Sequence, residues 1–335
     1  YEMKRVLKYI AALVVLGVIL AGIAGYYGYK LYNTARPLKQ ARIVKIPEGA
    51  TLNTIATILD EHNIIAHPRL FRLAARLRRI HDSLRAGEYK FTPPVSQADV
   101  LDKLHAGTTY RRSITIPEGW TSAQAVQRLR ATHHLSGTIG EIPEEGSLLP
   151  ETYHYRAGTQ RITLIRRMRT RMNKLMTRLW PHRDKDLPLD SREEAVILAS
   201  LVEKETGRKG ERDKVSGVFI NRLEAGMRLQ SDPSVIYAMT GGKPEMKGRG
   251  PIGRRLLKRD LEIDSPYNTY KNRGLPPGPI ANPGRKAIKA ALNWAEHNYL
   301  YFVADGSGGH NFAETLEAHN SNVRQWRKIR DEEDK

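Results

Sequence analysis

The hexapeptide Ile46-Pro47-Glu48-Gly49-Ala50-Thr51 recurs 70 residues later as Ile116-Pro117-Glu118-Gly119-Trp120-Thr121. In each copy an extended segment meets a Pro/Gly turn, and a Thr then precedes apolar residues at helical spacing. Each copy therefore predicts a strand, a tight turn and a helix that its Thr caps. The first copy is followed by a predicted helix over 68–79 and a predicted strand over 87–91. We therefore expect a chain of the α+β class.

The order strand–helix–helix–strand within one short segment also resembles the LysM module, a small fold that binds N-acetylglucosamine polymers. We therefore expect a LysM-like α/β subdomain, with an associated α+β region, over residues 43–155. An α+β spacer that binds no ligand is the alternative. A further capped helix is expected over 96–104, between the two copies.

Composition limits the classes of protein. The chain has 335 residues, enough for two or three domains of roughly 100–200 residues each. Its 40% hydrophobic residues exclude a disordered polyelectrolyte. The absence of Cys excludes disulfides, thiol nucleophiles and Cys-ligated metal sites. A net charge of +19 indicates a polyanionic neighbour such as nucleic acid, anionic lipid or an acidic polymer.

The N-terminal region predicts a membrane anchor over residues 9–29. This run carries no charge, and about 20 apolar residues suffice for a helix to cross the hydrocarbon core of a bilayer. A cleavable signal peptide is the alternative, with Gly22-Ile23-Ala24 as its cleavage site. Residues 30–42, which include Pro37, then form a linker. A short N-terminal tail and a large C-terminal body fit a single-pass protein whose body lies outside the cytoplasm, which makes nucleic acid a poor partner.

A basic helix is predicted over 161–178, within a connector that spans 156–190. Apolar residues recur at helical spacing along one face, and the other face carries six cations: Arg166, Arg167, Arg169, Arg171, Lys174 and Arg178. Such a run is commonly a solvated face, but its single sign also suits an anionic lipid or glycan. The last domain is expected over 191–327, followed by a charged tail over 328–335.

The stretch 193–206 contains two candidate acids, Glu203 and Glu205. At about 100° per residue, Glu205 falls in the middle of the apolar stripe of the predicted helix, and Glu203 falls on the opposite face. A carboxyl group among apolar side chains loses water, which raises its pKa toward the range of a general acid. We therefore expect Glu205 to be the functional acid and Glu203 to be exposed. The alternative is that Glu205 only pairs with an Arg at the helix end.

The segments that follow this helix share one character. They are Pro/Gly-rich loops that carry Tyr, Asn, Gln and Asp, groups that line carbohydrate clefts. The sequence lacks the HExxH, GxSxG and GxxxxGK motifs, and its 11 His residues are scattered, so no metal site is predicted.

From the membrane anchor through Asn320 the chain resembles a known family, the endolytic murein transglycosylases (YceG-like). The resemblance rests on motifs in family order: Glu203-Lys204-Glu205-Thr206, Val218-Phe219-Ile220-Asn221-Arg222-Leu223, Met227-Arg228-Leu229-Gln230-Ser231-Asp232-Pro233, Tyr267-Asn268-Thr269-Tyr270 and Gly274-Leu275-Pro276-Pro277-Gly278. It implies a bitopic protein of the bacterial inner (cytoplasmic) membrane, with a LysM-like subdomain and a mixed α+β lytic transglycosylase domain on the periplasmic side.

The resemblance implies that Glu205 is the catalytic acid, the residue that the helix geometry also selects. It implies substrate-binding roles for Thr206, Gln230, Asp232, Tyr267 and Asn268. The expected reaction is cleavage of the MurNAc–GlcNAc β-1,4 bond in nascent glycan strands, with 1,6-anhydroMurNAc ends and without a cofactor or metal. The expected partners are peptidoglycan, the membrane and cell-wall synthases.

Two other classes of function stay open at this point. A non-catalytic, membrane-tethered peptidoglycan-binding scaffold would keep the anchor and the LysM-like part. A membrane-tethered nucleic-acid binder would explain the charge, but it should show aromatic residues interleaved along the basic helix, and only Trp180 is near.

Overall fold

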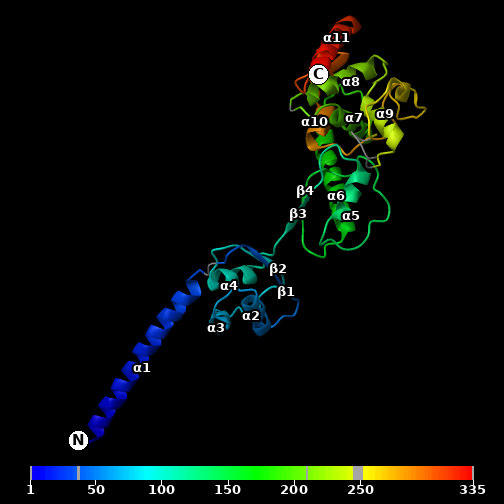
Figure 1. The fold of residues 1–335 in the computed structure, drawn as a ribbon. Coiled ribbons are helices and arrows are strands. Elements are labelled where there is room, and N and C mark those ends of the chain that lie inside the picture. Colours follow the sequence, from blue (N-terminus) through cyan, green and yellow to red (C-terminus); the bar gives the residue numbers. More distant parts are fainter. Residues whose placement is uncertain (1, 36–37, 209, 244–251, 334–335) are drawn as a thin grey trace. The chain divides into compact units, whose positions relative to one another are not determined.

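The computed structural model describes residues 2–35, 38–208, 210–243 and 252–333. The chain divides into two compact units, residues 1–112 and 113–335. Each unit has its own hydrophobic core, and each is described by itself (Figure 1). The predicted linker residue Pro37 and the last two residues of the predicted tail lie outside the described residues.

The first unit begins with helix α1 (Glu2–Asn33), which is exposed over most of its length and half-buried at Gly28 and Tyr32, near the end where Tyr32 packs against the core of the unit. Residues 5–33 of this helix are long and apolar enough to cross a membrane. The helix continues beyond residue 29 into the segment predicted as linker.

A small α+β body follows in the order β1 (Arg42–Ile46), α2 (Leu52–Glu61), α3 (Pro68–Leu77), β2 (Gly87–Phe91) and α4 (Gln97–Ala106). Strands β1 and β2 pair antiparallel, with Arg42 opposite Phe91 and Ile46 opposite Gly87. The side chain of Thr51 caps α2, and Ser96 caps α4 in a capping box with Asp99. The predicted order of strand, two helices and strand is therefore confirmed.

The second copy of the repeat folds as the first does. Strand β3 (Arg112–Thr115) leads through the turn to α5 (Ser122–Ala131), and Thr121 caps α5 with Gln124 in a capping box. Strand β3 pairs with β4 (Thr152–Tyr155). The boundary between the units lies at residue 112, inside the region 43–155 that the sequence suggested as one part. It lies there because the second copy packs against α6 (Arg161–Leu179) in a separate core.

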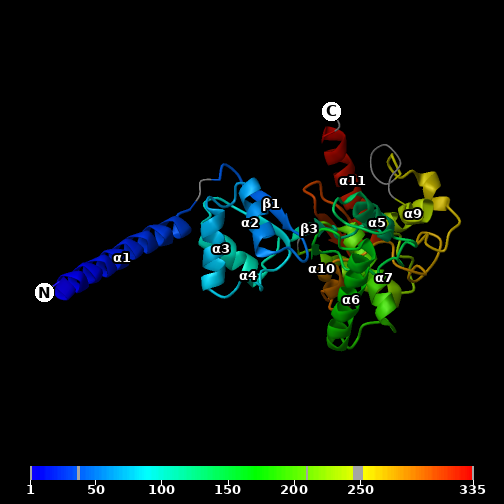
Figure 2. The same cartoon turned by 90° about the horizontal axis from the view of Figure 1, so that it is seen from below.

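Most of the remaining elements of the second unit build its largest core together with α6. The remaining elements are η1 (Trp180–His182), α7 (Arg192–Glu205), α8 (Arg212–Glu224), α9 (Asp232–Thr240), η2 (Lys258–Glu262), α10 (Arg285–Leu292), β5 (Tyr301–Ala304), β6 (His310–Ala313) and α11 (Leu316–Glu333). Helix α7 packs against α8, α9 and α10, which surround its label in Figure 1. Figure 2 shows the same unit turned by 90°. Strands β5 and β6 form an antiparallel hairpin. Helix α11 runs through the first six residues of the predicted charged tail.

Candidate active site

Helix α7 positions the two candidate acids, and its environment differs from the prediction. The eight residues from Ala195 to Val202 are all buried, because neighbouring helices cover α7 on several sides. The helix therefore has no solvated face along this stretch, and the expectation that Glu203 is exposed was wrong. The Glu203 side chain is only 4% exposed, and it accepts hydrogen bonds from Arg212 Nη2 at 2.9 Å and from the Gly284 amide at 2.8 Å. Glu203 thus ties α7 to the first turns of α8 and α10.

Glu205 is the last residue of α7 and is half-buried. Its Oε1 accepts one hydrogen bond, from Ser231 Oγ at 2.5 Å. Loss of water raises the pKa of Glu205 to about 7, with a further upward contribution from the nearby charge of Asp232. The Ser231 hydrogen bond and the charge of Arg222 act in the opposite direction. A carboxyl group with this pKa exchanges a proton readily near neutral pH.

Ser231 is held by a cluster of buried hydroxyl groups. Its amide donates to Thr269 Oγ1 at 2.9 Å, and Thr269 Oγ1 lies 2.8 Å from Ser234 Oγ. Ser234 Oγ in turn donates to the Ser231 carbonyl at 2.7 Å. All three residues are at most 1% exposed. The cluster fixes the Ser231 hydroxyl toward Glu205.

Arg222 supplies the positive charge of the site. It is 7% exposed, and its guanidinium donates to the carbonyls of Leu300 and Leu229 at 2.6 and 2.8 Å. The guanidinium also lies 5.2 Å from the centre of the Tyr301 ring. Burial lowers the pKa of Arg222. These contacts fix a cation near Glu205 without placing it in a direct ion pair with that carboxylate.

Gln230 and Asp232 are exposed and flank Ser231. Gln230 has a φ of +52°, a left-handed conformation that is uncommon for residues other than Gly. Its Oε1 lies 3.3 Å from Arg222 Nη1. Asp232 accepts a hydrogen bond from the Tyr270 hydroxyl at 2.6 Å. The pKa of Tyr270 is raised, mainly by burial and secondly by this hydrogen bond. Both side chains are thus accessible to a ligand that approaches Glu205.

The three other predicted substrate-binding residues differ in accessibility. Tyr267 is half-buried, and its ring lies 4.9 Å from the ring of Tyr237. Asn268 is fully buried and donates to the carbonyls of Leu261 and Ile263 at 2.8 and 2.9 Å. Thr206 is 2% exposed. Asn268 and Thr206 therefore hold loops in place here and present no free surface to a ligand.

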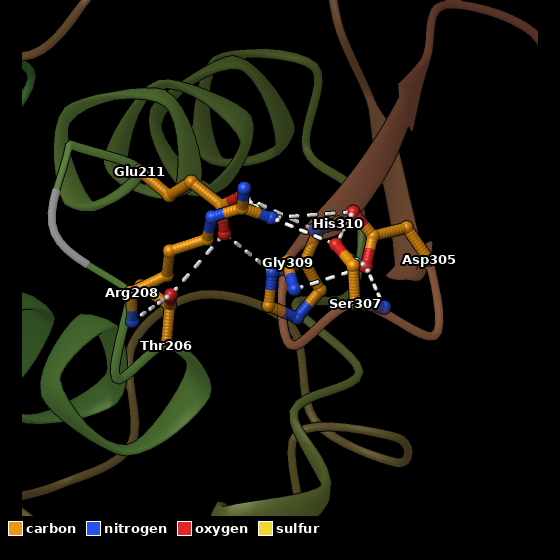
Figure 3. A network of polar contacts seen from close by, with 7 residues as sticks. All are labelled: Thr206, Arg208, Glu211, Asp305, Ser307, Gly309 and His310. Carbon is orange, nitrogen blue, oxygen red and sulfur yellow. Dashed lines mark hydrogen bonds and ion pairs between the residues drawn. The ribbon is translucent and has the colours of Figure 1, made fainter.

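Thr206 begins a polar network that joins the loop after Glu205 to the β5–β6 hairpin (Figure 3). Its hydroxyl donates to Glu211 Oε2 at 3.3 Å, and His310 Nδ1 lies 2.9 Å from the same oxygen. Arg208 Nη1 reaches Ser307 Oγ at 3.1 Å and Asp305 Oδ2 at 3.4 Å. The network anchors the backbone that follows the candidate acid.

Sequence reasoning missed four residues of this site: Arg222, Ser231, Ser234 and Thr269. Their only signal in the sequence was that three of them lie in the segments that carried the family motifs, Arg222 in one, Ser231 in another and Thr269 in a third. In the part of the chain that the structure describes, no group of three His, Asp or Glu side chains is arranged to hold a metal ion.

Comparisons with known proteins identify the family of the chain. A model of the YceG-like family matches residues 44–325. A protein of Bacillus subtilis named endolytic murein transglycosylase is 30% identical over 90% of this chain and 89% of its own length. A protein of the same name from Streptococcus pneumoniae is 30% identical over 94% of this chain, which spans 64% of that longer relative. A crystal structure of a yceG-like protein from Listeria monocytogenes superposes with a TM-score of 0.52 at 29% identity, over 84% of this chain and 99% of that one.

Proposed function

Because the chain belongs to the YceG-like family, we propose that it is an endolytic peptidoglycan lytic transglycosylase that cleaves the MurNAc–GlcNAc β-1,4 bond. The observation that carries the proposal is the environment of Glu205, a half-buried carboxyl whose pKa is raised to about 7 and which, among the described residues, accepts its hydrogen bond from a fixed Ser. The names of the two relatives point to the same substrate.

In the first step, Glu205 in its acid form protonates the glycosidic oxygen, and the C1–O bond breaks as positive charge develops at the MurNAc ring. Ser231 then stabilises the carboxylate that Glu205 has become, since a hydroxyl donor favours the charged form. Arg222 has the same effect through its charge. The site is thus arranged to hold both protonation states of one acid.

In the second step, Glu205 takes the proton of the MurNAc C6 hydroxyl, whose oxygen forms the new bond to C1. The product carries a 1,6-anhydro ring, the proton returns to Glu205, and no water is consumed. One carboxyl group suffices for this route, whereas hydrolysing glycosidases use a pair. Asp232, whose charge acts on Glu205, is a candidate for a second acid, and the Tyr270 hydroxyl already donates a hydrogen bond to one of its oxygens.

The exposed Gln230 and Asp232 and the half-buried Tyr267 are assigned to substrate contact. Gln230 offers an amide for sugar hydroxyl or N-acetyl groups, and Tyr267 offers an aromatic face. Thr206 and Asn268 are reassigned as positioning residues because both are buried.

Helix α1 is proposed as a single-pass anchor in the bacterial inner membrane, with the rest of the chain on the periplasmic side. The α+β body of residues 42–106 is proposed as a LysM-like glycan-binding subdomain, supported by its element order. This location places the enzyme where new strands emerge, and it makes cell-wall synthases natural partners.

The test is digestion of purified peptidoglycan by the full chain in detergent, with strand length measured by chromatography. The wild-type protein is expected to shorten the strands, and Glu205→Gln is expected not to. Glu224→Gln, an exposed acid on α8, is the matched control and should cleave normally. Strand shortening by Glu205→Gln at the wild-type rate would refute the assignment. Binding without cleavage by the wild-type protein would favour the scaffold alternative.

A further inference from the structure

A hollow lies in the same unit as Glu205, along the first half of α7. It has a volume of about 790 Å³ and lies between α6, α7, α9 and the loops around residues 144–147 and 277–279. All of its lining residues belong to the described part of the second unit. The mechanism proposed above uses none of them except Tyr267.

The hollow lies within reach of a ligand bound at Glu205. Ile197 lines it and precedes Glu205 by eight residues on α7, which corresponds to roughly 12 Å along the helix axis. Tyr237 and Tyr267 form one wall, and they belong to the segments that also hold Ser231 and Thr269. A group attached to a sugar at the catalytic acid is therefore able to extend into the hollow.

The charges of the lining indicate a ligand that carries both signs. Glu144 and Glu193 are exposed acids, and among the described residues neither side chain has an ion-pair partner. Arg192 is exposed beside them and makes one hydrogen bond, to Thr177 Oγ1 at 3.3 Å. The lining also holds Glu145, a half-buried acid that accepts hydrogen bonds from the Ser122 amide and from Asn282 Nδ2, so three acids and one Arg line the hollow.

The uncharged lining suits a short peptide. Met172 and Met176 provide flexible apolar surface that adapts to small side chains. The paired Tyr rings provide an apolar face with a hydroxyl group at its edge. The sugar backbone of peptidoglycan has no cationic group for the acids, whereas the peptide stem on each muramyl residue carries both a free ammonium group and free carboxylates.

We propose that this hollow binds the peptide stem of the substrate, with Glu193 and Glu144 facing its side-chain ammonium group and Arg192 facing a carboxylate. The inference rests on the proposed function, because it assumes a peptidoglycan strand at Glu205. It adds a specificity site: strands that carry uncut stems are preferred over bare glycan.

The first test measures binding without cleavage. The probe is the synthetic pentapeptide N-acetyl-L-alanyl-γ-D-glutamyl-L-lysyl-D-alanyl-D-alanine, whose ammonium group is that of the lysine side chain, titrated into the full chain in detergent by calorimetry. The same peptide with an acetylated lysine side chain should bind about tenfold more weakly, since a charge-assisted hydrogen bond is lost. Equal affinity for the two peptides, or no binding of either, would overturn the proposal whether or not the protein cleaves glycan.

The second test compares cleavage of stem-bearing strands with cleavage of strands stripped by an amidase. The double variant Arg192→Gln/Glu193→Gln should lose about 10- to 100-fold in kcat/KM on stem-bearing strands and little on stripped strands. Arg169→Gln/Glu224→Gln removes the same charges from exposed sites outside the hollow and should behave as wild type on both. An equal loss on both substrates in the first double variant would overturn the proposal. Absence of cleavage in every protein would refute the proposed function and leave the binding result to decide this inference.

Discussion

Ser231 occupies the N-cap position of α9, yet its hydroxyl does not cap the helix and instead donates to Glu205 Oε1 at 2.5 Å. An N-cap Ser ordinarily accepts a hydrogen bond from the amide two or three residues later, and loss of that bond typically costs about 1 kcal/mol. Here the Ser231 hydroxyl accepts no such bond and donates one to an acid 26 residues earlier in the chain. The fold thus gives up a local hydrogen bond to control the proton affinity of one carboxyl group.

Substitution Ser231→Ala should move the pH dependence of cleavage. The Ser231 hydrogen bond lowers the pKa of Glu205, so its removal leaves the acid form populated to higher pH. We expect the alkaline limb of kcat/KM to shift upward in pH, with a lower maximum because the carboxylate formed in the first step is less stabilised. Ser83→Ala, in the other unit, is the control. An unchanged pH profile in Ser231→Ala would show that the hydrogen bond does not tune Glu205.

Substitution Glu205→Gln should abolish cleavage and also stabilise the protein above pH 7. The rate should fall about 10²- to 10⁴-fold, the usual contribution of general acid–base catalysis. Between pH 4.5 and about 7 the folded wild type binds more protons than the unfolded chain, so its stability falls as pH rises through this range.

The variant lacks this penalty. At pH 8 it should be more stable than wild type by about 2 kcal/mol, allowing for the solvent that a half-buried group retains, and equally stable below pH 4.5. Urea unfolding followed by circular dichroism at both pH values measures the difference. A variant less stable than wild type at pH 8 would contradict a raised pKa.

Substitution Glu203→Gln should destabilise the protein and leave the cleavage reaction intact. The side chain is buried against Arg212 and the Gly284 amide, and removal of its charge leaves Arg212 without its partner in that place. We expect a loss of about 3 kcal/mol in unfolding free energy, in the range for a broken buried ion pair. Cleavage by the fraction that remains folded should persist. Inactive protein with unchanged stability would mean that Glu203, not Glu205, performs the chemistry.

The network of Figure 3 gives a prediction for the loop after Glu205. Arg208→Gln removes the contacts to Asp305 and Ser307 and leaves the Thr206–Glu211 hydrogen bond in place. Because Arg208 is 47% exposed, stability should change by less than about 1 kcal/mol. We expect a fall in kcat of about tenfold with little change in KM, since loss of an anchor displaces the acid. Arg166→Gln on α6 is the control. Equal kinetics for both variants would show that the network does not position Glu205.

Local patterns in the sequence predicted much of the fold. The Thr-capped repeat and the basic helix α6 form as expected. Both a cap and an amphipathic stripe depend on residues that are close together in the sequence. The position of Glu205 at the end of α7, with a raised pKa, also agrees with the prediction.

Such local patterns could not predict the burial of Glu203 or the hydrogen bond from Ser231 to Glu205. A polar residue opposite an apolar stripe appears solvated unless another element covers it, and Gly284, which covers Glu203, lies 81 residues later. The Ser231–Thr269 contact likewise joins residues 38 positions apart. Asn268 is buried because its amide donates hydrogen bonds to two carbonyls of the preceding loop. The spacing of residue types in the sequence does not reveal the path of that loop.

We propose that Glu205 acts alone and that the nucleophile comes from the substrate. Mass spectrometry of the muropeptides that the full chain releases from peptidoglycan in H₂¹⁸O distinguishes this route from hydrolysis. We expect 1,6-anhydroMurNAc ends without ¹⁸O, and no product from Glu205→Gln. Reducing MurNAc ends that carry ¹⁸O at C1 would contradict the proposal, because they would show attack by water and assign Asp232, or another acid, as the base.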